Sequence, residues 1–386
     1  MDATTLVASS HSSIDELGAA EWNGLEHGGV PFLRHEFLAA LEHSGAATPA
    51  TGWAPAHIAI HDGASLVGAM PLYAKSHSWG EFVFDFSWAQ AYERYGLAYY
   101  PKLVATTPFT PASGPRLLLR PGTDAARVRA ALIAALDALE PGASSVHVQF
   151  ATEEEASILA QSGFLRRIDC QFQWRNRGYR DFDDFLATFT ADKRKKAKRE
   201  RRRIEEAGVQ FEWRDGASLS DAEWQQVHAL HATTFHRHGR EPYLGVDFFL
   251  EASRTPAISP QVLMARAGST LVAIAIFFRG AQTLYGRYWG ASGEFHSLHF
   301  EACYHQGIEF CIRAGLAQFE PGTQGEHKIA RGFAPTLTHS AHLIREPRFR
   351  DAIARYLTEE RCSVLAYASE AGRHVPFRAD LDVQGS

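Results

Sequence analysis

Cysteine, long apolar runs and familiar catalytic signatures are scarce or missing in this chain of 386 residues. Its four cysteines form no CxxC pair and no Cys/His ladder, which excludes a dense disulfide framework and a zinc finger. No apolar run approaches the roughly 18 residues that a membrane-spanning helix needs. The N-terminus also lacks a basic stretch followed by an apolar one. We therefore expect a cytoplasmic protein with reduced thiols, no transmembrane segment and no metal site.

Motifs for covalent catalysis and for nucleotide binding are missing too. No GxSxG elbow, Walker loop or dinucleotide fingerprint stands in a strand–turn–helix setting. A covalent Ser or Cys nucleophile therefore has no support in the sequence, and we expect no tightly bound cofactor.

Positive charge is concentrated in one short run, KRKKAKRERRR at Lys193–Arg203. The run holds nine basic residues and one Glu, a local charge of +8, so the rest of the chain carries −13 because the total is −5. The protein is therefore not a general binder of polyanions, and any recognition of anions has to be local.

The composition and length predict two folded domains. Hydrophobic residues make up 45% of the chain and charged residues 22%, which is ample material for a large core. Single cores stop growing at roughly 250 to 300 residues, so a chain of this length favours two units.

An internal repeat supports this division. Pro31–Leu38 resembles Pro242–Phe249, and Ala54–Tyr73 resembles Ser259–Phe278 position for position. The longer pair reads as a strand, a turn around a glycine and an apolar strand. Two unrelated hairpins that look alike by chance are the alternative explanation. Because the matched segments recur in the same order, we favour a duplication.

A third strand is expected in each half, ending near Trp88 or Trp289, and a helix follows each, led by Tyr95 in the first half and by about Ser297 in the second. Three further elements are expected in the first half: a helix at 124–139, a strand at 145–150 and a helix near 153–162. Antiparallel strands followed by a strand–helix–strand unit predict an α/β (α+β) fold, with mixed, mostly antiparallel sheets flanked by helices. The expected modules are residues 1–165 and residues 166–386, the second with a basic helix at 191–207 and a C-terminal helix.

Three segments carry a resemblance to a known family: PFLRHEFLAALE at Pro31–Glu42, FDFSWAQAYERYGLAYYPKL at Phe84–Leu103 and FEPGTQGEHKIARGF at Phe319–Phe333. The chain resembles Fem-like (FemAB-like) members of the GNAT superfamily, the bacterial group known as predicted N-acyltransferases or peptidoglycan biosynthesis/recognition proteins. The resemblance implies two tandem GNAT-like modules. It also implies transfer of an aminoacyl group from aminoacyl-tRNA to the amine of a peptidoglycan precursor.

Two departures from the family leave the donor open. The chain has neither the coiled-coil arm that some Fem enzymes insert nor the Q/R-x-x-G-x-G/A loop by which relatives hold acetyl-CoA. Aminoacyl-tRNA and acyl-CoA both remain candidate donors. We expect direct attack by an amine on an activated acyl carbon in a cleft between the modules. The alternatives are an acyl-CoA-dependent N-acyltransferase of a small molecule or peptide, and a non-catalytic binder of anionic cell-wall precursor or RNA.

The best candidate for a catalytic segment is the glycine-flanked loop at Pro321–Phe333, which follows a short expected strand. Acyl transfer to an amine needs a base and donors that hold the oxyanion. The residues expected to act are Glu326 or His327 as the base, Lys328 and Arg331 as partners of a phosphate or carboxylate, and Gln324 as a substrate contact. The alternative is an ordinary surface loop without a catalytic role, because such loops are also rich in glycine and polar residues.

A second group of candidates follows the third strand of the second half. In GNAT-like modules the donor binds where this strand separates from its neighbour, and Gly290 and Gly293 would let an anion approach the next helix. The candidate substrate contacts are Arg287, Tyr288, Trp289, His299, Glu301 and Tyr304, with Glu301 and Tyr304 facing the cleft together. For the aromatic residues, packing in the core is the favoured alternative. In the first half, Trp88 and Tyr95 could line an acceptor groove.

The basic run itself is expected to form a helix with positive charge around most of its circumference. Lys195, Lys196, Arg199 and Arg202 are the candidate anion-binding residues. A tRNA backbone, the diphosphate of a lipid-linked acceptor or anionic lipid would suit them. The alternative is a helix whose charges are simply solvated and bind no ligand.

Overall fold

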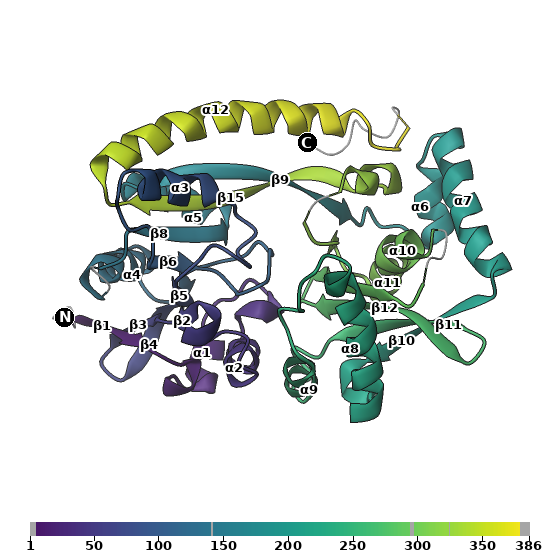
Figure 1. The fold of residues 1–386 in the computed structure, drawn as a ribbon, viewed down its shortest axis with the longest axis horizontal. Helices are drawn as coiled ribbons and strands as arrows, with labels where there is room; N and C mark the ends of the chain where they lie inside the picture. The colour runs from purple at the N-terminus through teal and green to yellow at the C-terminus, as the bar shows by residue number, and fades with distance from the viewer. Residues whose placement is uncertain (1–4, 140–141, 294–296, 324, 379–386) are drawn as a thin grey trace. The chain divides into compact units, whose positions relative to one another are not determined.

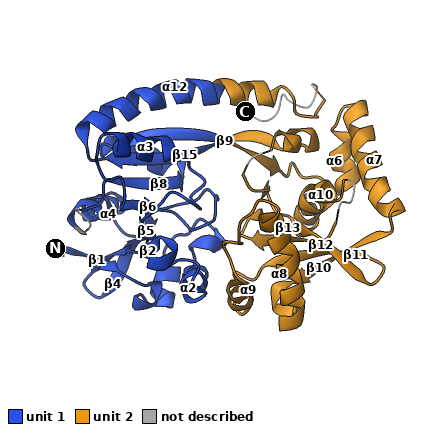
Figure 2. Cartoon of the chain, in the orientation of Figure 1, with its two compact units in different colours: residues 1–169, 337–365 blue, residues 170–336, 366–386 orange. Residues whose placement is uncertain are grey.

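The computed structural model describes residues 5–139, 142–293, 297–323 and 325–378 (Figure 1). The chain divides into two compact units (Figure 2). The first contains residues 1–169 and 337–365, and the second contains residues 170–336 and 366–386. Three elements cross from one unit to the other along the chain: β9 (Leu165–Arg175), β15 (Ala334–Ile344) and α12 (Pro347–Gly372).

The first unit contains two sheets. Its strands are β1 (Leu6–His11), β2 (Trp53–Pro55), β3 (His57–Asp62), β4 (Ser65–Met70), β5 (Leu72–Lys75), β6 (Lys102–Ala105), β7 (Leu118–Leu119) and β8 (Ser145–Ala151). One sheet has the order β1-β3-β4-β7, and the strands of the other run β15-β8-β6-β5-β2. Among these neighbours, as far as the structure describes them, β6 and β8 form the parallel pair and the others are antiparallel. All seven residues of β8 are buried, as expected of a strand that is covered on both faces.

Helices cover these sheets and complete the core of the first unit. They are α1 (Ala19–Asn23), α2 (His35–His43), α3 (Phe86–Arg94), α4 (Ala125–Leu139) and α5 (Glu153–Gln161), with short 3-10 turns at Ile14–Glu16, Pro31–Leu33 and Pro49–Thr51. Apolar residues of α4 such as Leu132 pack with Ile58 and Val146 in one buried cluster. The helices and the strand expected between residues 124 and 162 are confirmed within one residue at each end.

The second unit has one mixed sheet with the strand order β10-β11-β12-β13-β14-β9. Its strands are β10 (Val209–Asp215), β11 (Gln261–Ala267), β12 (Thr270–Arg279), β13 (Thr283–Ala291) and β14 (Gln318–Glu320). Within the described residues of this sheet, β13 and β14 form the parallel pair. The helices are α6 (Phe182–Ala187), α7 (Ala191–Glu206), α8 (Asp221–His236), α9 (Val246–Ser253), α10 (Leu298–Phe300), a π-helical turn (Glu301–His305) and α11 (Gln306–Ala314), with 3-10 turns at Gly216–Ser218 and Glu326–Arg331.

The hairpins predicted from the repeat are confirmed. β3 pairs with β4, and β11 pairs with β12, each in an antiparallel register. The turns contain Gly63 at φ +59° and Gly268 at φ +60°, a backbone conformation that favours glycine. The fold class predicted from the sequence, an α/β protein with mixed, mostly antiparallel sheets flanked by helices, is therefore confirmed.

One predicted strand is wrong. Trp88 lies in α3 instead of ending a strand, and Tyr95 is the C-cap of that helix instead of leading the next one. Trp88 and Tyr92, four residues apart, share one helical face and pack against Phe349 and Ile353 of α12. This face of α3 is covered by a helix that lies far away in sequence. The sequence of α3 alone therefore does not clearly indicate that the segment is a helix.

The division into units also differs from the predicted one, which placed the two modules at residues 1–165 and 166–386. The boundary in the structure falls after Asp169, and residues 337–365 belong to the first unit. The physical reason is that β15 pairs with β8 from His339 to Ile344. The first unit therefore needs a segment that follows the whole second unit in sequence.

Candidate functional site

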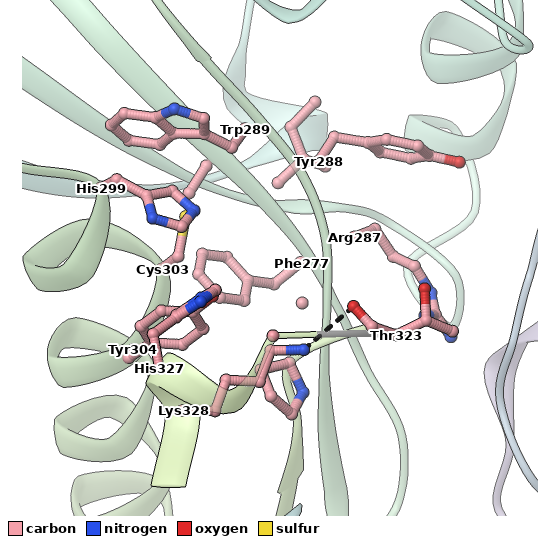
Figure 3. A pocket seen from close by; sticks show the side chains of 15 residues that line it. Phe277, Arg287, Tyr288, Trp289, His299, Cys303, Tyr304, Thr323, His327 and Lys328 are labelled. Atoms are coloured by element: carbon pink, nitrogen blue, oxygen red, sulfur yellow. Dashed lines mark hydrogen bonds between the residues drawn. The ribbon is translucent and has the colours of Figure 1, made fainter. Parts of the chain in front are cut away.

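A cavity of about 420 Å³ lies in the second unit, where two neighbouring strands separate (Figure 3). β13 and β14 pair only from Thr283–Gln318 to Tyr285–Glu320, after which the chain leaves β14 at Pro321. The next residues of β13, Gly286 to Trp289, border the cavity. The sequence prediction placed a ligand at this separation of strands, and the cavity occupies that position.

A β-bulge shapes one wall. Ile276 pairs with Tyr288 and Phe277 pairs with Gly286, so Arg287 is an extra residue in β13. A bulge of this kind changes the direction of nearby side chains and is common beside active sites. Phe277, Arg287 and Trp289 all border the cavity as a result of this arrangement.

The opposite wall is the glycine-rich loop after β14. Gly322 has φ +89° and Gly325 has φ +101°, both in the region that favours glycine. A Cβ atom on Gly325 would lie 2.3 Å from the His327 ring, so any other residue would displace that ring. The 3-10 turn Glu326–Arg331 then begins, and its first residues point to different sides.

Lys328 is the most deeply placed basic residue of this loop. Its side chain borders the cavity and is only 2% exposed, and its Nζ donates to the carbonyl oxygens of Gly322 at 2.7 Å and Thr323 at 3.1 Å. Burial lowers the pKa of Lys328 to about 7. Near neutral pH much of it is therefore an uncharged amine. In that form its two N–H groups donate to the two carbonyl oxygens, and the nitrogen lone pair stays available to accept a proton.

A tyrosine and two histidines lie beside Lys328. Tyr304 Oη and His327 Nε2 share a hydrogen bond of 2.8 Å, and the His299 ring lies 5.5 Å from the Tyr304 ring. Burial lowers the pKa of His299 to about 4, and it also lowers the pKa of His327. Burial raises the pKa of Tyr304, so its hydroxyl keeps its proton. At neutral pH these three residues are an uncharged hydrogen-bonding group.

Several cavity residues were not among the candidates from the sequence. Phe277, Cys303 and Thr323 border the cavity together with the predicted residues. Cys303 follows His299 by four residues, a spacing that puts both on one side of a helix and could have revealed it. Burial raises the pKa of the Cys303 thiol, so it is not an activated nucleophile.

Tyr288 has a mainly structural role. Its ring packs 4.6 Å from the His231 ring and 5.9 Å from the Phe249 ring, on α8 and α9. This agrees with the interpretation of the aromatic candidates as core residues. Gly290 is also explained by packing, because a Cβ atom there would lie 1.9 Å from the backbone oxygen of Leu230 on α8. Close approach of α8, and not the approach of a ligand, therefore accounts for the glycine at position 290.

Two predicted residues of the loop lie outside the cavity. Arg331 pairs with the carboxylate of Glu200 at 3.0 Å and stacks over Phe300 at 3.5 Å, so an internal carboxylate takes the place of the substrate phosphate or carboxylate expected there. Glu326 is exposed and accepts a hydrogen bond from Tyr367 Oη at 3.1 Å. Gln324 lies outside the described residues.

Glu301 does not face the cavity with Tyr304. It is buried, accepts from Gln306 Nε2 at 2.8 Å, pairs with Arg201 at 3.1 Å and contacts His305 Nδ1 at 3.0 Å. The cause is the π-helical turn Glu301–His305, which changes the faces that a regular helix would give these residues. These contacts lower the pKa of Glu301 against the effect of its burial.

The remaining candidates lie on two other surfaces. In the first unit, Trp88 and Tyr95 border a separate groove between α3 and α12. On α7, Lys195, Lys196, Arg199 and Arg202 are exposed, while Ala197, Glu200 and Ile204 form the buried face. Arg201 is set apart from its neighbours because it pairs with Glu301 and Glu309. In the described part of the chain, no helix is both long enough and apolar enough to cross a membrane.

Comparison with known proteins agrees with this architecture. A search of curated protein sequences finds no match. Among solved structures, FemX is 11% identical with a TM-score of 0.51, over 89% of this chain and 99% of FemX. L-PGS from Bacillus licheniformis is 11% identical with a TM-score of 0.51, over 83% of this chain and 95% of L-PGS. A tandem GNAT protein from the clavulanic acid biosynthesis pathway is 12% identical with a TM-score of 0.46, over 89% and 99%.

At these identities, FemX and L-PGS show that the fold is shared. The sequence itself matches the FemAB-like family, described as peptidoglycan biosynthesis/recognition, over residues 13–379. The match covers nearly the whole chain and both units, and it agrees with the resemblance found from sequence motifs. The chain belongs to the FemAB-like family.

Proposed function

We propose that this protein is an N-acyltransferase, in which an acceptor amine attacks an activated acyl carbon inside the cavity of the second unit. Membership of the FemAB-like family supports acyl or aminoacyl transfer as the reaction class. The observation that carries the proposal is Lys328, a buried amine that borders the cavity, serves two carbonyls and has a pKa of about 7. A lysine tuned to this range is suited to accept a proton at neutral pH.

In the proposed reaction, Lys328 accepts a proton from the neutral acceptor amine as its nitrogen attacks. A bond forms between this nitrogen and the acyl carbon, and the carbonyl oxygen becomes an oxyanion. Tyr304, held by its hydrogen bond to His327, donates to that oxyanion. The bond from the acyl carbon to the leaving sulfur or oxygen then breaks, and the proton passes to the leaving group. No covalent enzyme intermediate is required.

The lining of the cavity favours a simple acyl group over an aminoacyl group. Among the described residues that border it, the ionisable side chains are basic, phenolic or thiol groups, and none is a carboxylate. The two carbonyls that could receive an α-ammonium group already accept from Lys328. We therefore place an acyl thioester first as donor and aminoacyl-tRNA second. The acceptor is an amine, with a peptidoglycan precursor as one candidate, and a cytoplasmic location remains a prediction.

The alternative class is a non-catalytic binder of anionic cell-wall precursor or RNA. The exposed basic residues of α7 support it, because they present positive charge away from the cavity. This alternative predicts binding without turnover.

Turnover separates these functions. The full chain is mixed with acyl thioesters or charged tRNA and a panel of primary amines, and the amide product and the released thiol or uncharged tRNA are measured. Formation of an amide with release of one thiol, or of one uncharged tRNA, per product supports the proposal. Saturable binding of these compounds with no product from any donor would contradict it and favour the binding module.

A further inference from the structure

The first unit contains an apolar groove that the transfer reaction does not use. It lies between α3 and the first half of α12, both in blue in Figure 2, and has a volume of about 460 Å³. Trp88, Phe349 and Ile353 border it and are each at most 9% exposed. Ala91 and Ala352 also border it, and their small side chains keep the two helices from filling the space between them.

Two tyrosines stand at the edge of this groove. Tyr95 is 73% exposed and Tyr356 is 46% exposed, although both border an apolar space. The Tyr95 ring meets the Phe349 ring edge-on at 5.6 Å. Exposed tyrosines around an apolar floor present large rings to a ligand while their hydroxyls stay at the polar edge, and here the Tyr356 hydroxyl donates to Glu360 at 2.9 Å.

The groove carries positive charge at one end. Arg348, in the first turn of α12, is the charged residue among the described residues that border the groove, and its side chain is 76% exposed. It pairs with Glu346 at 2.8 Å, a residue that does not border the groove. A ligand with an anionic group would therefore find an exposed guanidinium next to an apolar channel.

The size of the groove favours a small ligand over a protein segment. Small-molecule sites commonly have volumes of about 300 to 1,000 Å³. A stable protein interface buries at least about 1,000 Å², which a groove of nine lining residues does not provide. A fatty-acyl amphiphile has an apolar chain that fits between two helices and one charged end, so it matches this groove.

We propose that this groove binds the hydrocarbon chain of a fatty-acyl amphiphile, with its carboxylate paired to Arg348. The site is independent of the transfer reaction, so its test does not depend on turnover. The chain of the ligand lies against Trp88, Phe349 and Ile353, and Tyr95 and Tyr356 close over it.

The test measures binding of dodecanoate to the full chain by calorimetry, below the micelle concentration. Dodecyltrimethylammonium, with the same chain and a cationic head, and butyrate, with the same head and a short chain, are the matched probes. We expect one dodecanoate per chain and at least tenfold weaker binding of both other probes. Arg348→Glu should weaken dodecanoate at least tenfold, and Ala352→Trp should fill the groove and do the same.

Arg355→Glu is the control, because Arg355 is exposed on α12 and does not border the groove. It should leave the affinity for dodecanoate within twofold. Unchanged affinity in both Arg348→Glu and Ala352→Trp, or no saturable binding by the wild type, would overturn the proposal. A concentration-dependent dimer in sedimentation that Tyr95→Ala abolishes would overturn it as well, and would assign the groove to a second copy of the chain.

Discussion

Burial sets the protonation state of Lys328 and makes the stability of the protein depend on pH. The pKa of Lys328 falls from the ordinary value of 10.5 to about 7 in the folded protein. Between these two values the unfolded chain binds more protons than the folded one, so stability rises with pH across this window. The same argument applies to Lys75, whose pKa burial lowers to about 7.

Replacing Lys328 by Met isolates its contribution, because Lys75 is present in both proteins. The free energy of unfolding of Lys328→Met should exceed that of the wild type near pH 7.5. The gap should shrink by about 1.4 kcal/mol per pH unit up to about pH 9.5. Denaturant unfolding at pH 7.5, 8.5 and 9.5 measures it. Parallel pH curves for the two proteins would show that Lys328 is charged in the folded state.

In the proposed reaction the hydroxyl of Tyr304 donates to the oxyanion, a role that a structural tyrosine would not have. Tyr304→Phe removes the group that shares a hydrogen bond with His327 and keeps the ring. We expect kcat to fall by about 10²- to 10³-fold, the usual cost of one oxyanion donor, with little change in KM. Tyr92→Phe, in the core of the first unit, is the matched control and should leave kcat unchanged. A similar loss in both variants would indicate a general effect on folding.

At the scale of residues, the sequence could select the loop that borders the cavity, but it could not show which of its side chains point inward. Glycines around Glu326, His327 and Lys328, just after a strand, were enough to select the loop. The 3-10 turn gives about three residues per turn, so consecutive side chains point in different directions. Lys328 therefore enters the cavity, while Glu326 reaches Tyr367. Which residue turns inward depends on packing that the local sequence does not contain.

At the scale of elements, the regular strands and helices followed from hydrophobic patterns and turn residues. The hairpins at Gly63 and Gly268 and the helix α7 were found in this way. The π-helical turn Glu301–His305 was not, because one extra residue per turn leaves no mark on composition. The placement of Trp88 in α3 was also missed, since its face is covered by α12 from the other end of the chain.

The exposed cations of α7 lead to a prediction about anion binding. Neutralising Lys195, Lys196, Arg199 and Arg202 with Gln should weaken binding of a polyphosphate probe. The slope of log affinity against log salt concentration should also become shallower. The change should be up to about 0.9 for each phosphate that the variant no longer neutralises, the value found for double-stranded DNA. Fluorescence titration at several salt concentrations measures both quantities.

Arg201→Gln is the control for this helix, because Arg201 pairs with Glu301 and Glu309 instead of facing solvent. It should lower stability by less than the about 3 to 5 kcal/mol that a buried carboxylate left with no partner costs, because Glu301 keeps its contacts with Gln306 and His305, and it should leave the salt slope unchanged. If the fourfold variant kept the wild-type slope, α7 would be a solvated helix and not a binding surface.

At the scale of the whole molecule, the two units are not independent lengths of chain. The first unit contains residues 1–169 and 337–365, so its β8 receives the partner strand β15 only after the second unit has been made. The internal repeat predicted two modules but not this return of the chain. Pairing between strands that are almost two hundred residues apart in sequence leaves no local pattern from which to predict it.

A truncated chain of residues 1–169 should therefore fail to fold on its own. It would leave one edge of β8 unpaired and expose Trp88 and Tyr92 where Phe349 and Ile353 normally cover them. We expect aggregation, or a thermal transition without cooperativity. Joining residues 337–365 to this fragment through a flexible linker should restore a cooperative transition. A cooperative, soluble fragment of residues 1–169 alone would contradict this division.

We claim above all that acyl transfer takes place in the cavity of the second unit, with Lys328 as the proton acceptor. The most direct test is the single-turnover rate of transfer from an acyl thioester to an amine, from pH 5.5 to 9, in the wild type and in Lys328→Met. Comparison of the two proteins removes the contribution of the titrating acceptor amine. The wild-type rate relative to the variant should rise about tenfold per pH unit up to about pH 7 and then level off. The folded variant should be at least 10²-fold slower at pH 8; a folded variant with the wild-type rate and the wild-type pH profile would contradict the claim.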